Sequence, residues 1–135
     1  MPEIEEALTA YLLEHAGLAA LVGSRVYWDE VPQGTEPPFV VAINISDVKE
    51  HTLDGQLSLE SPTYQFTAYA TTKKTSKTIG KQIKAALQDY VGVMSGVRVQ
   101  LVRLLTELST ATHNADGTVQ LYTTDLEFQV HFERS

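Results

Sequence analysis

Cysteine is absent from this sequence, and no apolar run approaches the length of a membrane helix. The first absence excludes disulfide bonds and thiolate metal sites. A membrane helix needs roughly 20 predominantly apolar residues. The acidic start, residues 1–6, also lacks the basic segment and apolar run of a signal peptide. We therefore expect a soluble protein that is made in the cytoplasm and does not contact a membrane.

The composition is that of a globular protein: 43% of the 135 residues are hydrophobic and 20% are charged. A chain of this size buries roughly two thirds of the surface that it exposes when unfolded. It can therefore build a core without a metal or a disulfide. We find no internal repeat or linker, and we expect residues 1–135 to form a single domain.

The charges are unevenly distributed along the chain. Residues 1–60 carry eleven acidic and two basic residues, a net charge of −9, whereas residues 61–135 carry six acidic and eight basic residues, a net charge of +2. An acidic protein repels a phosphate backbone, which argues against general nucleic-acid binding. Separated charges favour head-to-tail contact between identical copies. A scatter of charges on a solvated surface is the alternative interpretation.

Two segments have the periodicity of amphipathic helices. The first begins near Ile4, and Gly17 is a natural stop. Residues 18–22 could add a short helical turn. The second segment spans about residues 73–91, and its apolar stripe consists of Ile79, Ile83, Ala86, Leu87 and Tyr90.

Five segments have the alternation and composition of β-strands. They cover residues 25–29, 39–46, 58–69, 97–108 and 119–132, with Pro62 interrupting the third. Residues 109–118 are polar, so the last two strands are predicted to form a hairpin with a long tip. We expect an α+β fold, in which a mainly antiparallel sheet of four to five strands carries two helices on one face.

A row of lysines lies opposite the apolar stripe of the second helix: Lys73, Lys77, Lys81 and Lys84, with Lys74 beside them. This row is a possible interaction surface for an acidic patch on a neighbouring copy or on another protein. A solvated helix face is the simpler interpretation. A nucleic-acid adaptor is a third, but no aromatic residue is interleaved with the lysines to stack on bases.

The sequence contains no recognisable catalytic signature, and we expect neither an enzyme nor a cofactor. Nucleophile elbows and phosphate-binding loops are absent. Of the four histidines (His15, His51, His113, His131), only His131 shares a predicted strand face with carboxylates, those of Glu127 and Glu133. A zinc site needs three or four converging ligands. A small ligand- or metal-binding domain, with His131, Glu127 and Glu133 brought together by folding, therefore remains an alternative function.

Several segments, in this order, resemble the tail completion proteins of phages and prophages, the tail terminator or tail-to-head joining group. They are residues 18–27 (LAALVGSRVY), 31–34 (VPQG), 37–41 (PPFVV) with Ser46, 64–70 (YQFTAYA), 83–87 (IKAAL) and 126–132 (LEFQVHF). Each motif is weak by itself, but their order and spacing are more specific. Residues 47–61 match the pattern least.

The resemblance implies a structural virion protein of the phage tail, assembled in the cytoplasm of the host bacterium. Such proteins form a ring, typically a hexamer, that caps the finished tail tube and joins it to the head connector. The implied partners are other copies of the chain, the tail tube protein and the head–tail connector protein, while DNA passes through the lumen without specific binding. A head–tail connector, or neck, component is an alternative within the same class.

Overall fold

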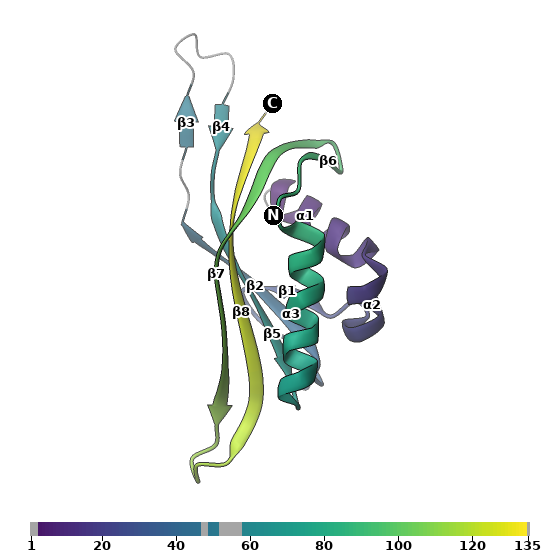
Figure 1. The fold of residues 1–135 in the computed structure, drawn as a ribbon, viewed down its shortest axis with the longest axis vertical. Helices are drawn as coiled ribbons and strands as arrows, with labels where there is room; N and C mark the ends of the chain where they lie inside the picture. Colours follow the sequence, from purple (N-terminus) through teal and green to yellow (C-terminus); the bar gives the residue numbers. More distant parts are fainter. Residues whose placement is uncertain (1–2, 47–48, 52–57, 135) are drawn as a thin grey trace.

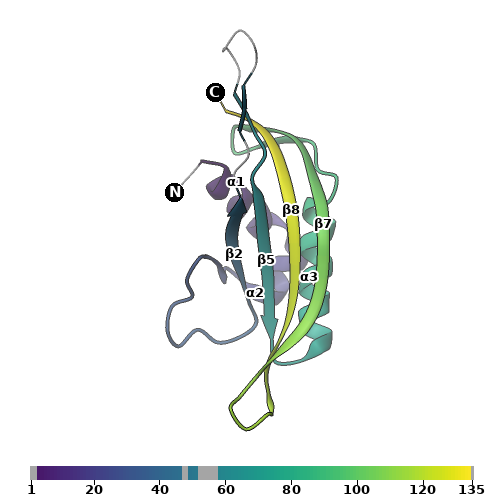
Figure 2. The same ribbon diagram turned by 90° about the vertical axis from the view of Figure 1, so that its left-hand side faces the viewer.

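In the computed structural model, which describes residues 3–46, 49–51 and 58–134, three helices lie on one side of a curled sheet (Figure 1). The helices are α1 (Glu3–Glu14), α2 (Ala16–Val22) and α3 (Lys73–Leu87). No helix of the described residues lies on the opposite side of the sheet (Figure 2). The predicted α+β class, with the helices on one face, is confirmed.

The eight strands in the described part of the chain belong to one sheet. They are β1 (Val26–Trp28), β2 (Phe39–Ser46), β3 (Lys49–His51), β4 (Ser58–Glu60), β5 (Thr63–Ala70), β6 (Gly92–Met94), β7 (Val97–His113) and β8 (Val119–Arg134). The long strand β8 pairs with β5 and β4 along one edge and with β7 along the other, and every pairing except the parallel one between β1 and β2 is antiparallel.

The predicted numbers, four to five strands and two helices, were wrong, because the described residues form eight strands and three helices. The first helix ends at Glu14, and a second begins at Ala16 because His15 takes an extended conformation (φ −77°, ψ 107°) between them. Strands β3 and β6 have three residues each, which is too short to show a period-two pattern. The predicted strand at residues 58–69, with Pro62 interrupting it, is divided into β4 and β5. His15, predicted to close the first helix, instead caps α2.

The boundaries of two predicted elements also change. Helix α3 ends at Leu87, not near residue 91, because Gln88 is extended and Asp89 has a φ of 63°. Strand β7 continues through the predicted polar loop to His113. Its hydroxyl side chains pair across the strands there, as in the 2.8 Å bond between the Thr110 and Thr123 hydroxyls. The hairpin tip is therefore shorter than predicted.

The core lies between the helices and the inner face of the sheet. Its largest fully buried side chains come from all three helices and from β2, β5 and β8, and include Leu8, Leu18, Ile83, Tyr64, Phe66 and Phe128. The alternation predicted for the last strand is confirmed: Leu126, Phe128 and Val130 are fully buried. Their odd-numbered neighbours face the helix-free side and are partly exposed.

Two hairpins project beyond the body of the sheet in opposite directions (Figure 1). One is formed by the distal ends of β7 and β8, and the other carries β3 and β4. Residues 47–61, which match the tail completion pattern least, include β3 (residues 49–51) and β4 (residues 58–60). Residues 47–48 and 52–57 lie outside the described residues. Among the helices that the structure describes, none could span a membrane.

Candidate interaction surfaces

A groove runs between α3 and β7, and lysines line its helical wall. Lys74, Lys77, Lys81 and Lys84 come from α3, while Glu107 and Ser109 are among the residues of the β7 wall. Three members of the predicted surface are therefore together in the groove. Lys73 is not part of the lining, and its neighbour Lys74 takes that place. No acidic residue occurs in α3, so every charged side chain on the helical wall is positive.

Small and hydroxylated residues fix α3 close to the sheet below this groove. A β-carbon on Gly80 would lie 2.7 Å from Thr124 Cγ2, so only glycine permits the approach. The buried Ser76 hydroxyl is within hydrogen-bond distance of the Thr124 hydroxyl (2.7 Å) and donates to the Ala68 carbonyl (3.3 Å). At its start, α3 is capped by the Thr72 hydroxyl, which accepts from the Thr75 amide at 3.2 Å.

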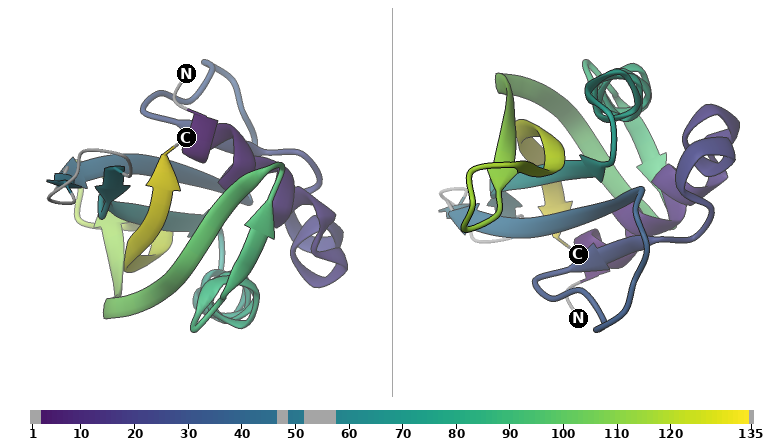
Figure 3. Two further views of the ribbon diagram at one scale, coloured as in Figure 1. Left: turned by 90° about the horizontal axis from the view of Figure 1, so that it is seen from above. Right: turned by 90° about the horizontal axis from the view of Figure 1, so that it is seen from below.

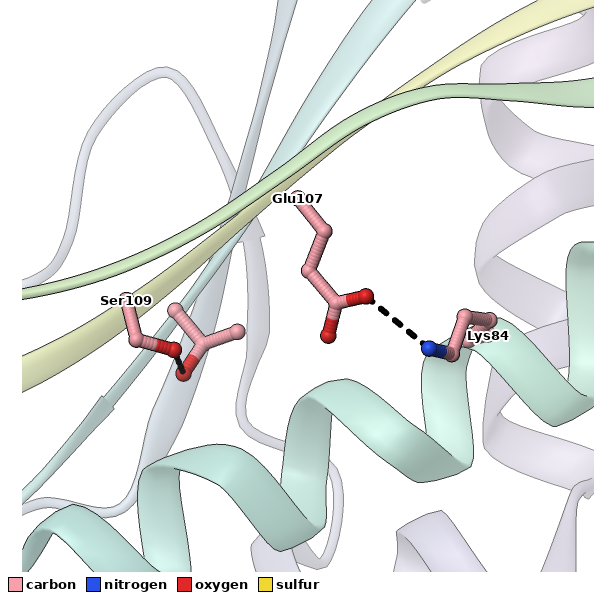
Figure 4. A network of polar contacts seen from close by, with 4 residues as sticks. Lys84, Glu107 and Ser109 are labelled. Atoms are coloured by element: carbon pink, nitrogen blue, oxygen red, sulfur yellow. Dashed lines mark hydrogen bonds and ion pairs between the residues drawn. The ribbon is translucent and has the colours of Figure 1, made fainter.

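An ion pair joins the two walls of the groove (Figure 4). Lys84 Nζ lies 2.9 Å from Glu107 Oε1, with both side chains more than one third exposed. Such a pair contributes at most about 1 kcal/mol to stability, because water and salt screen it. Among the described residues, Lys74, Lys77 and Lys81 form no ion pair. Their charge is therefore available to another molecule.

A β-bulge explains how Glu107 reaches α3. Val102 and Leu104 pair with Val130 and Phe128 on the helix side of the sheet, and the register then shifts at Leu105. The extra residue turns Glu107, rather than Thr106, toward the helix, because a bulge changes which side chains face each way. Glu107 could not be predicted as part of this surface, since strand alternation gives no sign of where a bulge will occur.

The outer edge of β7 beside the groove is unpaired over most of its length. Strand β6 covers only residues 97–99, and the backbone of Val102 bonds to Asp89 and Tyr90. Beyond Val102, no other backbone in the described part of the chain pairs with this edge. An exposed edge offers backbone donors and acceptors to another chain.

The alternative metal site is not assembled among the residues described. Glu127, His131 and Glu133 each bond to a different neighbour: Thr106 Oγ1 donates to Glu127 at 2.6 Å, and Gln100 Nε2 to Glu133 at 2.8 Å. The third member, His131 Nδ1, is 2.7 Å from the Ser61 hydroxyl. No group of three potential metal ligands occurs in the ranges that the structure describes. His15, another of the four histidines, also has a hydrogen-bond partner: its Nε2 is 3.0 Å from Gln82 Oε1, and this contact links the start of α2 to α3.

A second, more apolar groove lies at the opposite edge of the sheet, between α1 and β1. Its lining includes Ala10, Leu13, Tyr27 and Trp28. The Trp28 indole donates to the Thr9 hydroxyl at 2.6 Å and meets the Tyr64 ring edge-on at 5.4 Å between centroids. Outside the lining of this groove, the Tyr11 ring of α1 meets the Tyr90 ring edge-on with the centroids 4.8 Å apart. Partial burial, and then the proximity of Tyr90, raises the pKa of the Tyr11 hydroxyl.

The helix-free face of the sheet is partly aromatic. Phe39 of β2 stacks on Tyr69 of β5 with the ring centroids 5.0 Å apart. Burial, and then the proximity of Asp125, raises the pKa of the Tyr69 hydroxyl. Asp125 itself accepts a 2.7 Å hydrogen bond from the Thr67 hydroxyl. This face thus combines ring contacts near β2 with a hydrogen-bonded polar region near β8.

Comparison with protein families gives a match to one model, the tail completion protein gp17 family, over residues 6–133. The chain belongs to this family. Tail completion proteins are structural virion proteins of phage tails, as the sequence resemblance implied. The match extends over both grooves and over α2, α3 and all but the first three residues of α1.

A solved structure has the same fold as this tail completion protein. A chain of a structure described as the virion of a native gene transfer agent particle superposes with a TM-score of 0.72 at 22% sequence identity. The similar region covers 97% of this chain and 95% of that chain. No curated protein sequence matches.

Proposed function

We propose that this tail completion protein forms a ring, a hexamer, that caps the finished phage tail tube and joins it to the head connector. Family membership over residues 6–133 is the observation that carries the proposal. The fold shared with a chain of a gene transfer agent virion supports it, since that structure is a phage-like particle. In this role the protein assembles in the cytoplasm of the host bacterium and becomes part of the virion tail.

Charge supports a channel role rather than DNA recognition. The net charge is −7, so a ring of identical copies would be strongly acidic and would repel the DNA backbone. DNA would pass through the lumen without specific binding. We further propose that the protein is not an enzyme and needs no cofactor, since a ring of this kind acts through its surfaces.

The two projecting hairpins suit contacts with different partners. They extend from opposite ends of the sheet (Figure 1). A subunit that presents one hairpin to the tail tube protein and the other to the head connector protein could bridge the two. Long β-hairpins extend the sheet without a separate domain, which places contact residues far from the core.

Electron microscopy of the purified protein, with and without isolated tail tubes, tests this function. We expect rings that sit on one end of the tubes, and light scattering should give their mass. Failure to form rings or to bind tubes at any concentration would contradict the proposal. Binding to isolated heads instead of tails would indicate a neck component.

A further inference from the structure

We propose that the lysine groove receives the acidic β1–β2 loop of the next copy, so that the subunits of the ring contact one another head to tail. This inference rests on the proposed ring. The β1–β2 loop, residues 29–38, carries three exposed carboxylates, those of Asp29, Glu30 and Glu36, and no basic residue. The groove carries the lysines of α3. The contact therefore joins opposite charges.

The loop and the groove lie on opposite sides of the subunit. Strand β1 is at the edge of the sheet beyond β2 and β5, whereas β7 and β6 lie on the other side of β8. Two perpendicular views agree that the blue loop between β1 and β2 lies far from α3 (Figures 2 and 3). Two complementary surfaces on opposite sides of one molecule give a heterologous contact, which closes into a ring when the rotation between copies allows.

Hydrogen bonds hold the loop in a defined shape. Arg25 Nε donates to the Pro38 carbonyl at 2.8 Å, and the Asp29 amide donates to Ala42 at 2.9 Å. Within the loop, the Thr35 hydroxyl donates to the Pro32 carbonyl at 2.6 Å. A loop that is already ordered loses less conformational entropy on binding. The three carboxylates have no ion-pair partner among the described residues.

The free edge of β7 adds backbone groups to the same groove. The loop contains three prolines, which offer carbonyl acceptors but no amide donors. It is thus suited to accept hydrogen bonds from edge amides rather than to extend the sheet as a full strand. The lysines and the β7 edge together favour an acidic, proline-containing segment, and this chain supplies one.

Phosphate is the competing ligand for lysines. Glu107 pairs with Lys84 in the groove, which leaves three lysines of the groove without an ion pair in the described ranges. The net charge of −7 repels a polyanion such as nucleic acid. A peptide loop with discrete carboxylates can instead pair with Lys74, Lys77 and Lys81 while Lys84 remains bound to Glu107. We therefore favour a second copy of the chain over nucleic acid.

Charge reversal in a double-mutant cycle tests the contact. Changing Lys77 and Lys81 to Glu (K77E/K81E), or Glu30 and Glu36 to Lys (E30K/E36K), should raise the concentration for half-maximal ring assembly by about tenfold or more, because like charges then face each other. Combining the four changes should restore assembly to near the wild-type value. The control K73E/R103E changes the net charge as much as K77E/K81E, at exposed positions outside the groove lining, and Arg103 lies opposite the neutral Gln129. It should assemble normally.

Cross-linking locates the contact directly, because the natural chain has no cysteine. In a ring of the double variant E36C/K77C, a short bis-maleimide should join neighbouring subunits into a ladder that continues beyond the dimer. Its largest product counts the subunits in the ring. A mixture of the single variants E36C and K77C should give only dimers, and neither variant alone should cross-link.

The outcomes separate the docking contact from the proposed function. If wild-type rings form on tail tubes but neither reversal affects them and no ladder appears, the proposed docking contact is refuted, while the proposed ring is supported. If only the lysine reversal disrupts assembly, and the loop reversal does not, the groove binds a different acidic partner and the inference fails. If the wild-type chain forms no ring with or without tubes, both fail.

Discussion

Gly80 of α3 packs against Thr124 of β8 with no room for a side chain: a β-carbon on Gly80 would lie 2.7 Å from Thr124 Cγ2. The contact lies in the middle of the helix, beside the bond between Ser76 and Thr124. It determines how closely α3 approaches the sheet, and therefore the width of the lysine groove above it.

Replacing Gly80 with alanine should destabilise the protein. Alanine in a helix gains about 1 kcal/mol over glycine, but overpacking a tight contact costs about 1–3 kcal/mol. We expect a net loss of about 1 kcal/mol in the free energy of unfolding, measured by urea denaturation. In a Thr124→Ser background, which removes Cγ2 and keeps the hydroxyl, the same change should be neutral or stabilising. An equal loss in both backgrounds would exclude the clash as the cause.

Replacing Thr9 with valine tests the hydrogen bond that anchors Trp28. The substitution keeps the shape but removes the oxygen that accepts from the indole at 2.6 Å. A part-buried donor without a partner costs about 1–3 kcal/mol, and the tryptophan fluorescence should shift because its environment changes. Thr78→Val is the matched control: Thr9 and Thr78 both donate to a carbonyl four residues earlier, but only Thr9 binds tryptophan. Equal effects of the two changes would contradict the role of Thr9.

Regular patterns made much of the fold predictable. The alternation of Leu126, Phe128 and Val130 identified the inner face of the last strand, and the spacing of Ile79, Ile83 and Leu87 identified the buried side of α3. Both depend on local geometry, which repeats with a fixed period. The family resemblance came from the same patterns, with a few marked residues between them.

The groove could be predicted only in part, because it depends on contacts between distant segments. The lysines follow the helical period, so their shared face was predictable. The opposite wall depends on the bulge at Leu105 and on Gly80 fitting against Thr124, and neither leaves a periodic signal. Contacts between distant segments also explain why the predicted metal site is not assembled. Glu127, His131 and Glu133 share a strand face, but each is hydrogen-bonded to a different residue of β7 or to Ser61.

Divalent metals should not stabilise the protein through His131. Its Nδ1 is 2.7 Å from the Ser61 hydroxyl, so a metal at that nitrogen would have to displace the bond. A metal at the other ring nitrogen would lack ligands, because no group of three potential ligands occurs among the described residues. We expect no change in melting temperature with zinc, nickel or manganese, in the wild type or in His131→Ala. The control Ser61→Ala frees the nitrogen and leaves the carboxylates in place. A metal-dependent rise in the wild type that is lost in His131→Ala would support the alternative function instead.

The turn at the tip of the β7–β8 hairpin should loosen in acid. Asp116 Oδ1 accepts from the Thr118 hydroxyl at 2.6 Å and from its amide at 3.0 Å, and these bonds hold the pKa of Asp116 below its usual value. A carboxyl with a lowered pKa in the folded state contributes stability above its unfolded-state pKa, and this contribution is lost as the pH falls through the folded-state pKa. Carbonyl-detected NMR titration should show the low pKa, and the protection of the Thr118 amide against exchange, relative to an unstructured peptide at the same pH, should fall over the same pH range. In Thr118→Val only the amide bond remains, so the pKa should rise part of the way toward its usual value. An unchanged pKa in that variant would show that the hydroxyl does not hold the turn.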